Sequence, residues 1–402
     1  MRNIYLISLL ILFLACQHQA EKEKESPLPI LDLTKEYPKR LIDIHEIADV
    51  EYIPLETTKE SALALPHSFS ISEKYIFIAD ILMSDAYIQI FNRQGKHLSN
   101  QNNRGQGPKD YYYIRTFAVD FEKEEYYIDD RVKIQVYDFE GKWKRTYKLP
   151  EGMIYGSLFD YNEQYLIGNN MFHDYFTPKH IPEDKHPYYL INKENWQHLP
   201  LDIHVEKKVS RIFDKGLQHL AKRGTSPDVK SMHFIEPFLA NSHDILIADF
   251  GQDTLYRFKD NKLEPIAVQY PPVHNDKDEI PTIVGTLAYS DQYLFFKPVV
   301  MKYIPEDINK PYYDAPLLMW DRNTNEIFNV QLFDSNRPNA KKRSFVPMGD
   351  IVFETPNCLY DFYRTEILIE EYEAGNLKGK LKEVASKLKF DDNNVIAIYK
   401  LK

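Results

Sequence analysis

Short apolar runs that end in polar turns recur along the chain. The first complete copy, Tyr75–Lys96, reads Y-I-F-I-A-D, then a polar break, then Y-I-Q-I-F-N-R-Q-G-K. Runs of this length, rich in aromatic and β-branched side chains and bounded by turn residues, predict β-strands. Gly95 supplies the positive φ that a tight hairpin needs. The pattern therefore predicts strands joined by short polar turns.

The strand Tyr75–Asp80 has five counterparts, which are Tyr126–Asp130, Tyr165–Asn169, Ile245–Asp249, Tyr293–Lys297 and Ile351–Thr355. Second strands follow at Ile88–Asn92, Ile134–Asp138, Tyr188–Asn192, Thr254–Phe258 and Leu317–Asp321, and closing strands at Trp143–Leu149, Leu263–Val268 and Ile327–Phe333. A meander of this kind buries one apolar face only against its neighbours. Six such units predict an all-β fold, a six-bladed β-propeller.

The two ends of the chain are expected to close the ring. Asn394–Leu401 has the pattern of a strand, and we expect it to lie beside Val50–Leu55 in the last blade, which removes free sheet edges at the seam. Helical spacing of apolar residues predicts two inserted helices, one at Val205–Arg223 after the third unit and one at Leu377–Leu388. The fold is expected to begin near Leu41.

Residues 1–16 have the pattern of a bacterial export signal. Arg2 is positive, and the apolar run Ile4–Ala15 has 12 residues, fewer than the roughly 20 that span a bilayer as a helix. Leu14-Ala15-Cys16 resembles a lipobox, in which Cys16 carries the lipid. We therefore expect a signal peptide at 1–15, a lipidated Cys16 with a flexible tether at 16–40, and the propeller at 41–402. A plain secretory signal with an incidental cysteine is the alternative.

These features predict an outer-membrane lipoprotein of the cell envelope. Acidic residues after Cys16 alternate with Lys22 and Lys24, so exposure at the cell surface stays open. The whole chain has 50 Lys and Arg against 60 Asp and Glu, a net charge of −10, which argues against nucleic acid as a partner. Cys16 and Cys358 are the two cysteines, too few for a disulfide framework or a cysteine-based zinc site. We expect no cofactor and no metal, and a buried Cys358.

Two motifs connect the chain to a family. Phe91–Lys96, followed by Arg104–Tyr111, resembles the F-D-x-x-G-K … G-Q-G-P-x-E-Y signature of the six-bladed β-propeller lipoproteins of Bacteroidota type, with Asp110 in place of Glu. Glu51–Glu56 and Asp391–Leu401 also resemble that family, which usually has Pro where Asn394 stands. The resemblance covers 41–402, and the strands alone are similar to propellers of the NHL kind. It implies a fold and a location, without a common activity.

The stretch Arg104–Tyr111 is the first candidate site. Gly105 and Gly107 free the backbone, so that Arg104 and exposed N–H groups could hold an anionic group of a ligand, with Tyr111 beside it. The structural alternative is a loop that carries the chain from the outer strand of one blade to the inner strand of the next. It is not a phosphate loop, because no Gly-Lys-Ser/Thr and no helix follow.

Three aspartates, Asp80, Asp130 and Asp249, end the same strand of three units. Their carboxylates could point at the central channel and bind a polar or cationic ligand. Short Asp side chains also cap turns by accepting hydrogen bonds from nearby N–H groups, and repetition in several units favours that alternative.

Histidine and aromatic residues give weaker candidates. Five histidines fall in one region, namely His173, His180, His186, His198 and His204, without a His-Glu-x-x-His motif, so we interpret them as loop surface. His173-Asp174 could form an acid–base pair. The aromatic residues Tyr111–Tyr113, Tyr155, Tyr161, Tyr312, Tyr313 and Trp320 could form a platform for a sugar or peptide, although packing between blades explains most aromatic residues in such a fold.

The sequence favours a lipid-anchored propeller of the cell envelope that binds a ligand or partner at one mouth of the ring. The candidate partners are a glycan, a peptide or another envelope protein. The alternative is a propeller hydrolase or lyase acting on a polysaccharide or peptide, which requires at least three polar groups, two of them titratable, together at one mouth. A purely structural scaffold is the third hypothesis. The ligand and the oligomeric state stay open.

Overall fold

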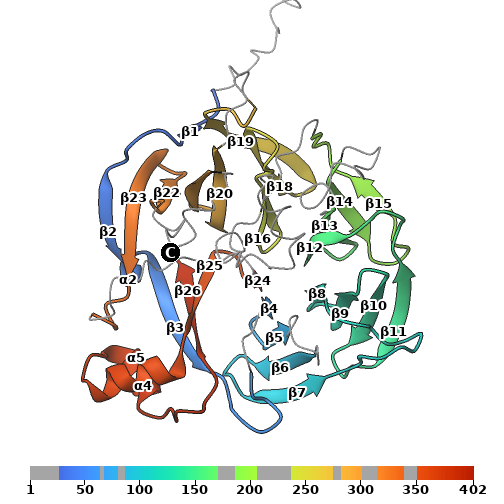
Figure 1. Cartoon of the computed structure of the whole chain (residues 1–402), viewed down its shortest axis with the longest axis horizontal. Helices are drawn as coiled ribbons and strands as arrows, with labels where there is room; N and C mark the ends of the chain where they lie inside the picture. The colour runs from blue at the N-terminus through green and yellow to red at the C-terminus, as the bar shows by residue number, and fades with distance from the viewer. Residues whose placement is uncertain are drawn as a thin grey trace, which may run out of the picture.

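The six predicted units form six sheets around a central axis (Figure 1). The structure is a computed structural model that describes residues 27–63, 68–79, 87–170, 186–205, 237–274, 282–300, 315–338 and 351–402. The fold is the six-bladed β-propeller that the repeated strands predict, and we number the blades I to VI along the chain.

Blades II and III consist of four consecutive antiparallel strands, and blade I has four such strands together with one from the C-terminal part of the chain. From the axis outward, the consecutive strands of blade I are β4 (Ser68–Ile71), β5 (Tyr75–Ala79), β6 (Ile88–Asn92) and β7 (His97–Gln101). Those of blade II are β8 (Thr116–Asp120), β9 (Glu125–Asp129), β10 (Lys133–Asp138) and β11 (Trp143–Lys148). Those of blade III are β12 (Tyr155–Asp160), β13 (Tyr165–Asn170), β14 (Tyr188–Asn192) and β15 (His198–Pro200). Each predicted first and second strand of these units matches a strand of the structure.

Blades IV and V each add an N-terminal strand at the outer edge. The strands of blade IV are β16 (Phe238–Asn241), β17 (Asp244–Ile247), β18 (Thr254–Lys259), β19 (Lys262–Tyr270) and β1 (Ile30–Asp32). The strands of blade V are β20 (Thr282–Tyr289), β21 (Tyr293–Val300), β22 (Leu318–Asp321), β23 (Glu326–Phe333) and β2 (Lys39–Asp43). Strands β1 and β2 run parallel to β19 and β23. The fold therefore begins before the predicted start near Leu41. The pattern of apolar residues did not indicate β1, because an edge strand pairs through its backbone groups and needs few apolar side chains.

Blade VI closes the ring as expected. Strand β26 (Val395–Leu401) lies between β25 (Cys358–Tyr363) and β3 (Ala48–Pro54), and its register with β3 runs from Val395↔Pro54 to Leu401↔Ala48. A strand from the N-terminal part of the chain, β3, and the last described strand, β26, thus share one sheet.

The interpretation of Ile351–Thr355 as the first strand of a sixth repeat is wrong. Strand β24 (Ile351–Phe353) instead runs parallel to β4 and becomes the innermost strand of blade I. The Phe353 side chain packs with Phe69 and Tyr360 in a cluster between blades VI and I. A three-residue apolar strand fits either sheet, and this cluster decides which one it joins.

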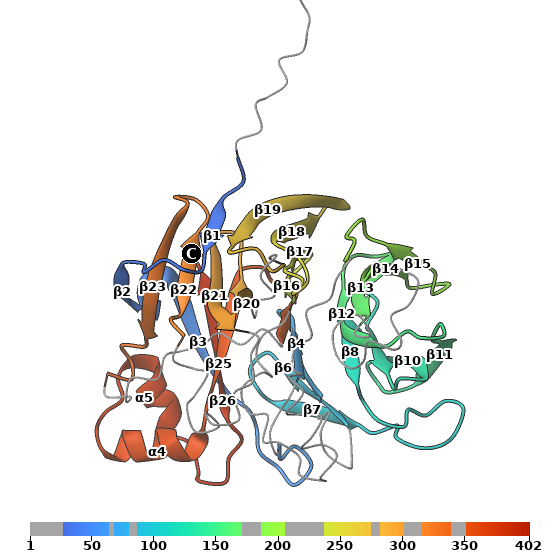
Figure 2. The same cartoon turned by 45° about the horizontal axis from the view of Figure 1, so that its top comes forward.

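The helices agree with the sequence only in part. The helix expected at Leu377–Leu388 is present as the shorter α5 (Gly379–Ala385). A preceding helix, α4 (Thr365–Glu373), was not predicted, and a single turn, α2 (Ile44–Ile47), leads into β3. Helices α4 and α5 lie together beside blade VI (Figure 2). Apart from Val205, the other predicted helix, 205–223, lies outside the described residues.

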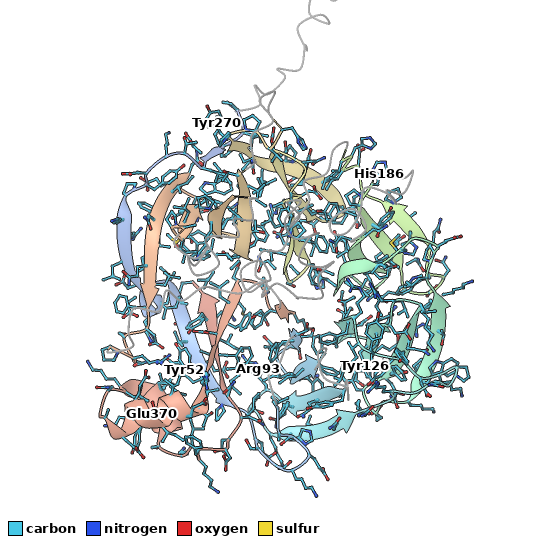
Figure 3. All side chains as sticks on the ribbon, in the orientation of Figure 1. Tyr52, Arg93, Tyr126, His186, Tyr270 and Glu370 are labelled. Atoms are coloured by element: carbon cyan, nitrogen blue, oxygen red, sulfur yellow. The ribbon has the colours of Figure 1, made fainter. Side chains whose placement is uncertain are left out.

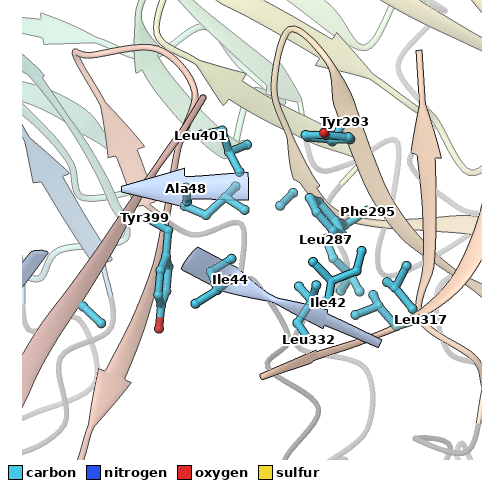
Figure 4. Packing of buried hydrophobic residues seen from close by; sticks show 14 of the residues in the cluster. Ile42, Ile44, Ala48, Leu287, Tyr293, Phe295, Leu317, Leu332, Tyr399 and Leu401 are labelled. Carbon is cyan, nitrogen blue, oxygen red and sulfur yellow. The ribbon is translucent and has the colours of Figure 1, made fainter. Parts of the chain in front are cut away.

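Buried side chains between neighbouring blades form the core. The cluster between blades V and VI includes Ile42, Phe295 and Tyr399 (Figure 4), and Leu368 and Leu381 of the two helices join it. In blade II, Tyr126 (Figure 3) stacks on Tyr137 with ring centroids 5.4 Å apart. Among the platform candidates, Tyr111, Tyr155, Tyr161 and Trp320 are buried, as the packing alternative predicts, but Tyr112 is 59% exposed and Tyr113 is half-buried. Tyr312 and Tyr313 lie outside the described residues.

Candidate functional site

The antiparallel strand order gives the ring two different mouths. One is formed by the turns between the first and second strand of each blade, which we call the turn face. The other carries the linkers from each outer strand to the next blade, together with the turns between second and third strands, and we call it the linker face. Residues 102–115 connect β7 to β8, so the Arg104–Tyr111 stretch is a linker between two blades, as the structural alternative predicts.

The Arg104–Tyr111 loop is closed by its own hydrogen bonds. Arg104 and Tyr111 form a β-bridge, and the Gly105 N–H donates to the Tyr111 carbonyl oxygen at 3.0 Å. The Gly107 N–H donates to Asp110 Oδ2 at 2.8 Å. A Cβ on Gly105 would overlap that carboxylate, which explains the glycine. The two N–H groups that could have held an anion are thus used within the loop.

Side chains of β10 in blade II also bind the same loop. Gln135 Nε2 donates to the carbonyl oxygens of Pro108 at 3.0 Å and Asp110 at 2.8 Å, and the Tyr137 hydroxyl donates to that of Lys109 at 2.6 Å. Tyr111 is 1% exposed and therefore presents no face to a ligand. The Arg104 side chain donates from Nε to the Tyr112 carbonyl oxygen. These contacts give the motif a structural role, and ligand binding by Arg104, Gly105, Gly107 and Tyr111 stays a prediction.

The strand-end aspartates cap local structure. Asp130 accepts hydrogen bonds from the N–H groups of Tyr112, Val132 and Lys133. Asp249, in blade IV, accepts from the Gly251 N–H at 2.7 Å and from the Tyr188 hydroxyl at 2.9 Å. Both are buried and have different partners in different blades. Asp80 lies outside the described residues, so binding by these three aspartates stays a prediction.

Of the described histidines of the central region, His204 is an exposed loop residue, whereas His198 stands on β15. His198 Nε2 lies 2.5 Å from the Tyr155 hydroxyl oxygen within blade III, and burial lowers the pKa of His198 to about 4. His186 Nδ1 lies 3.1 Å from the Leu201 carbonyl oxygen. Burial by aromatic neighbours, which no local motif reveals, makes the loop-surface interpretation wrong for His198. His173 and His180 lie outside the described residues.

The turn face carries a pocket of about 360 Å³ that the sequence analysis missed. Turns and inner-strand ends from blades I to IV line it, with the end of β24 on the remaining side. The lining residues are Ser70, Val119, Phe121, Glu122, Asp160, Tyr161, Asn162, Glu163, Ser242, His243, Lys259, Asp260, Asn261, Phe353 and Glu354. This volume is at the lower end of small-molecule sites.

Asn357 links three blades at the same mouth. Its N–H donates to Asn241 Oδ1 of blade IV at 2.6 Å, and its Oδ1 accepts from the Asp291 N–H of blade V at 2.8 Å. Its Nδ2 also donates to Asp291 Oδ2 at 3.0 Å. Asn357 therefore joins blades IV and V to blade VI through its backbone N–H and its side chain.

A buried ion cluster meets the pocket at Asp160, the member of the cluster that lines it. Lys193 Nζ lies 2.5 Å from Asp120 Oδ2 and 2.6 Å from Asp160 Oδ1, and the Lys193 and Asp120 side chains are each 1% exposed. The contact with Asp160 is an ion pair without hydrogen-bond geometry. Burial raises the pKa of Asp160 to about 7, although Lys193 opposes this. Two carboxylates thus share one ammonium group, which leaves excess negative charge beside the pocket.

A second carboxylate of the pocket is also perturbed. Burial raises the pKa of Glu354, and the negative charges of Glu73 and Glu122 add to that effect while His243 opposes it. His243 is fixed by its Nδ1, which lies 2.5 Å from the Tyr161 carbonyl oxygen. The pocket is therefore acidic. Among the described residues, no three His, Cys, Asp or Glu side chains are placed to hold a metal ion together.

A sequence signal for this face existed but was not used. An acidic residue stands two positions before the tyrosine that opens the second strand in four blades, at Glu73, Glu124, Glu163 and Asp291. These acids fall in the turns of one mouth. A comparison of the turns before the repeated strands, rather than of the strand ends after them, would have indicated an acidic turn face.

The fold and its two mouths define a six-bladed β-propeller. The chain belongs to the family described as "Domain of unknown function (DUF4934)", whose profile matches residues 28–400. It is similar in structure to a putative exported protein from Bacteroides fragilis, with a TM-score of 0.60 and 13% identity over 93% of this chain and 99% of that one. A member of the DUF4221 family from Bacteroides vulgatus has a TM-score of 0.50 and 13% identity, over 89% and 97%.

These likenesses support the propeller fold. No curated protein matches the chain in sequence. Within the described part of the chain, no helix has the length and apolar character to cross a membrane. The NHL-like relationship and the lipid anchor stay predictions.

Proposed function

We propose that this protein is an exported, lipid-anchored β-propeller of the cell envelope that binds a ligand in the turn-face pocket. The observation that carries the binding proposal is the pocket itself, which gathers polar side chains from blades I to IV around an apolar wall. Small-molecule sites combine such a concave apolar surface with a few polar groups. The ligand or partner is a glycan, a peptide or part of another envelope protein.

Two observations support the lipid anchor, one from the sequence and one from a protein of similar fold. Cys16 follows an export signal of lipobox type, and one similar structure is described as a putative exported protein. Metabolic labelling with a palmitate analogue tests the anchor. We expect label in the wild-type chain and none in Cys16→Ser, and equal labelling of both would refute it.

Fragment binding tests the pocket. Ligand-detected NMR with a chemically mixed fragment set should give hits whose signals vanish in Ser70→Phe, because the new ring fills the cavity that Ser70 lines. Glu163→Trp, on an exposed turn at the rim, provides a second blocking variant should Ser70→Phe fold poorly. Glu373→Trp, on the exposed end of α4, is the control that should keep every hit. Hits that persist in both blocked variants would refute binding at this site.

One observation favours the hydrolase or lyase alternative. The titratable groups of the pocket include Asp160, Glu354 and His243, and the pKa of Asp160 lies near neutrality. We prefer binding because Asp160 is already paired with Lys193. Turnover of a polysaccharide or peptide mixture that disappears in Asp160→Asn, with fragment binding retained, would favour the enzyme.

A further inference from the structure

We propose that the turn-face pocket recognises an organic cation, a primary ammonium or guanidinium group carried on an apolar stem. This inference rests on the proposed binding function and names its ligand class. The cation would be a free amine or the side chain of a basic residue in a peptide, since both present the same group.

The charges of the pocket are unbalanced. Its lining has five carboxylates, and Lys259 is its single Lys or Arg. Lys259 pairs with Asp244, a residue that does not line the pocket, and its Nζ lies 3.5 Å from Asp244 Oδ2. Asp160 pairs with Lys193. Within the described ranges, the carboxylates of Glu122, Glu163, Asp260 and Glu354 have no Lys, Arg or His nitrogen within 4 Å. A cation would therefore meet four unpaired negative charges around one cavity.

A buried hydroxyl gives independent evidence for a ligand. Ser70 is 3% exposed, stands on the inner strand β4, and lines the pocket. Its hydroxyl makes no hydrogen bond to any other described residue and is open to the cavity, because it is not among the fully buried polar atoms that lack a partner. A hydroxyl at the wall of a cavity bonds water there unless a ligand takes the place of that water. A donor that enters the pocket, such as an ammonium N–H, would take the place of that water.

The apolar part of the pocket suits the stem of such a ligand. Val119 and Phe353 are buried beside the cavity, and Phe121 packs against Phe77 with its ring edge-on at 5.8 Å. Aromatic faces attract cations and cover alkyl chains. The raised pKa of Glu354 agrees with this account, because a bound cation would relieve the repulsion from Glu73 and Glu122.

Calorimetry with a matched pair of probes tests the ligand class. Hexane-1,6-diamine and hexane-1,6-diol share a stem and differ in charge, so we expect the diamine to bind at least about tenfold more tightly at low salt. Glu122→Gln and Glu354→Gln should each weaken diamine binding several-fold. Glu373→Gln, an exposed helix position, should leave it unchanged. Equal binding of diol and diamine, or an unchanged affinity in both pocket variants, would overturn the proposal.

Further binding measurements distinguish a peptide from a free amine as the source of the cation. They also distinguish a wrong ligand class from a wrong proposal for the pocket itself. Binding of N-acetyl-lysine methylamide more tightly than the diamine supports a peptide source, and the reverse supports a free amine. Binding of Ca²⁺ without the diamine would overturn the organic cation. If uncharged fragments bind and are lost in Ser70→Phe while the diamine does not bind, the ligand class is wrong and the pocket function stands. If no fragment is lost in either blocked variant, the proposed function itself fails.

Discussion

Buried ionisable residues gather at the boundary between blades II and III. Asp129 is fully buried, accepts from the Arg131 N–H at 2.7 Å through Oδ1, and has no hydrogen-bond partner for Oδ2 among the described residues. Burial raises the pKa of Asp129 to about 7. Asp160 and its partner Lys193 lie at the turn-face side of the same boundary. Such groups link stability to pH.

Asp129→Asn should change the pH dependence of stability. The folded pKa lies above the ordinary value, so the folded state holds the proton more tightly and wild-type stability falls as pH rises from about 4 to about 7. Asparagine cannot ionise and keeps the acceptor for Arg131. We expect the free energy of unfolding of the variant, relative to wild type, to rise across that window by at most ~1.4 kcal/mol per pH unit. Urea denaturation at several pH values measures it.

The matched control for that prediction is Asp49→Asn. The Asp49 side chain is 84% exposed, so its removal should leave the shape of the pH profile unchanged. A profile of Asp129→Asn that parallels wild type from pH 4 to 7 would contradict the assignment of a raised pKa to this residue.

Lys193→Met should destabilise the fold by about 3–5 kcal/mol, because it leaves two buried carboxylates without their shared cation. Adding Asp120→Asn to the same chain should recover part of the loss, since one charge is then gone. Chemical denaturation of the single and double variants gives the comparison. A single variant within about 1 kcal/mol of wild type would show that the cluster contributes little.

At this scale the sequence indicated unusual residues but misjudged their roles. Gly105, Gly107 and Asp110 stand out in a chain with few glycines, yet their backbone freedom serves a contact within the loop. The conformation of the loop also depends on distant partners such as Gln135, whose amide donates to loop carbonyl oxygens, and a linear pattern does not show such partners. Ser70 and Glu354 belong to no motif and meet only in the folded ring.

At the scale of the elements, the Arg104–Tyr111 loop connects blade I to blade II through contacts that its own sequence sets. A Cβ at Gly105 would displace the Asp110 carboxylate from the Gly107 N–H, so Gly105→Ala should cost about 1–3 kcal/mol. In an Asp110→Ala background the same substitution should cost much less, because the obstacle is absent. A double-mutant cycle by urea denaturation measures this coupling. Additive effects would contradict the contact.

The sequence predicted most of the strands, but it predicted only in part which sheet each strand joins. Alternating apolar runs with turns indicated the second and third strands of five blades, as well as the pairing of β26 with β3. Strand β24 left its expected blade because the packing of Phe353 decides its sheet. Strands β1 and β2 carry little apolar pattern, since they lie at outer edges and pair through backbone groups.

For the whole molecule, stability should depend on closure of the ring. Strand β26 pairs on both sides, whereas the three residues of β1 pair only with β19. Deletion of residues 395–402 should therefore abolish a cooperative thermal transition, because β3 loses its partner and blade VI opens. A chain that begins at residue 34 should keep the transition with a loss of at most about 2 kcal/mol. Circular dichroism during heating compares them, and equal effects of the two deletions would contradict this view of closure.

The central claim is that the ligand site lies at the acidic turn face rather than at the glycine-containing linker. A crystal structure of the chain with hexane-1,6-diamine tests it most directly. The account predicts the diamine in the turn-face pocket, with an ammonium group within hydrogen-bond distance of Glu122 or Glu354 and its stem against Phe353. A diamine bound only on the linker face, at the Arg104–Tyr111 loop, with the turn-face pocket holding only water, would contradict it.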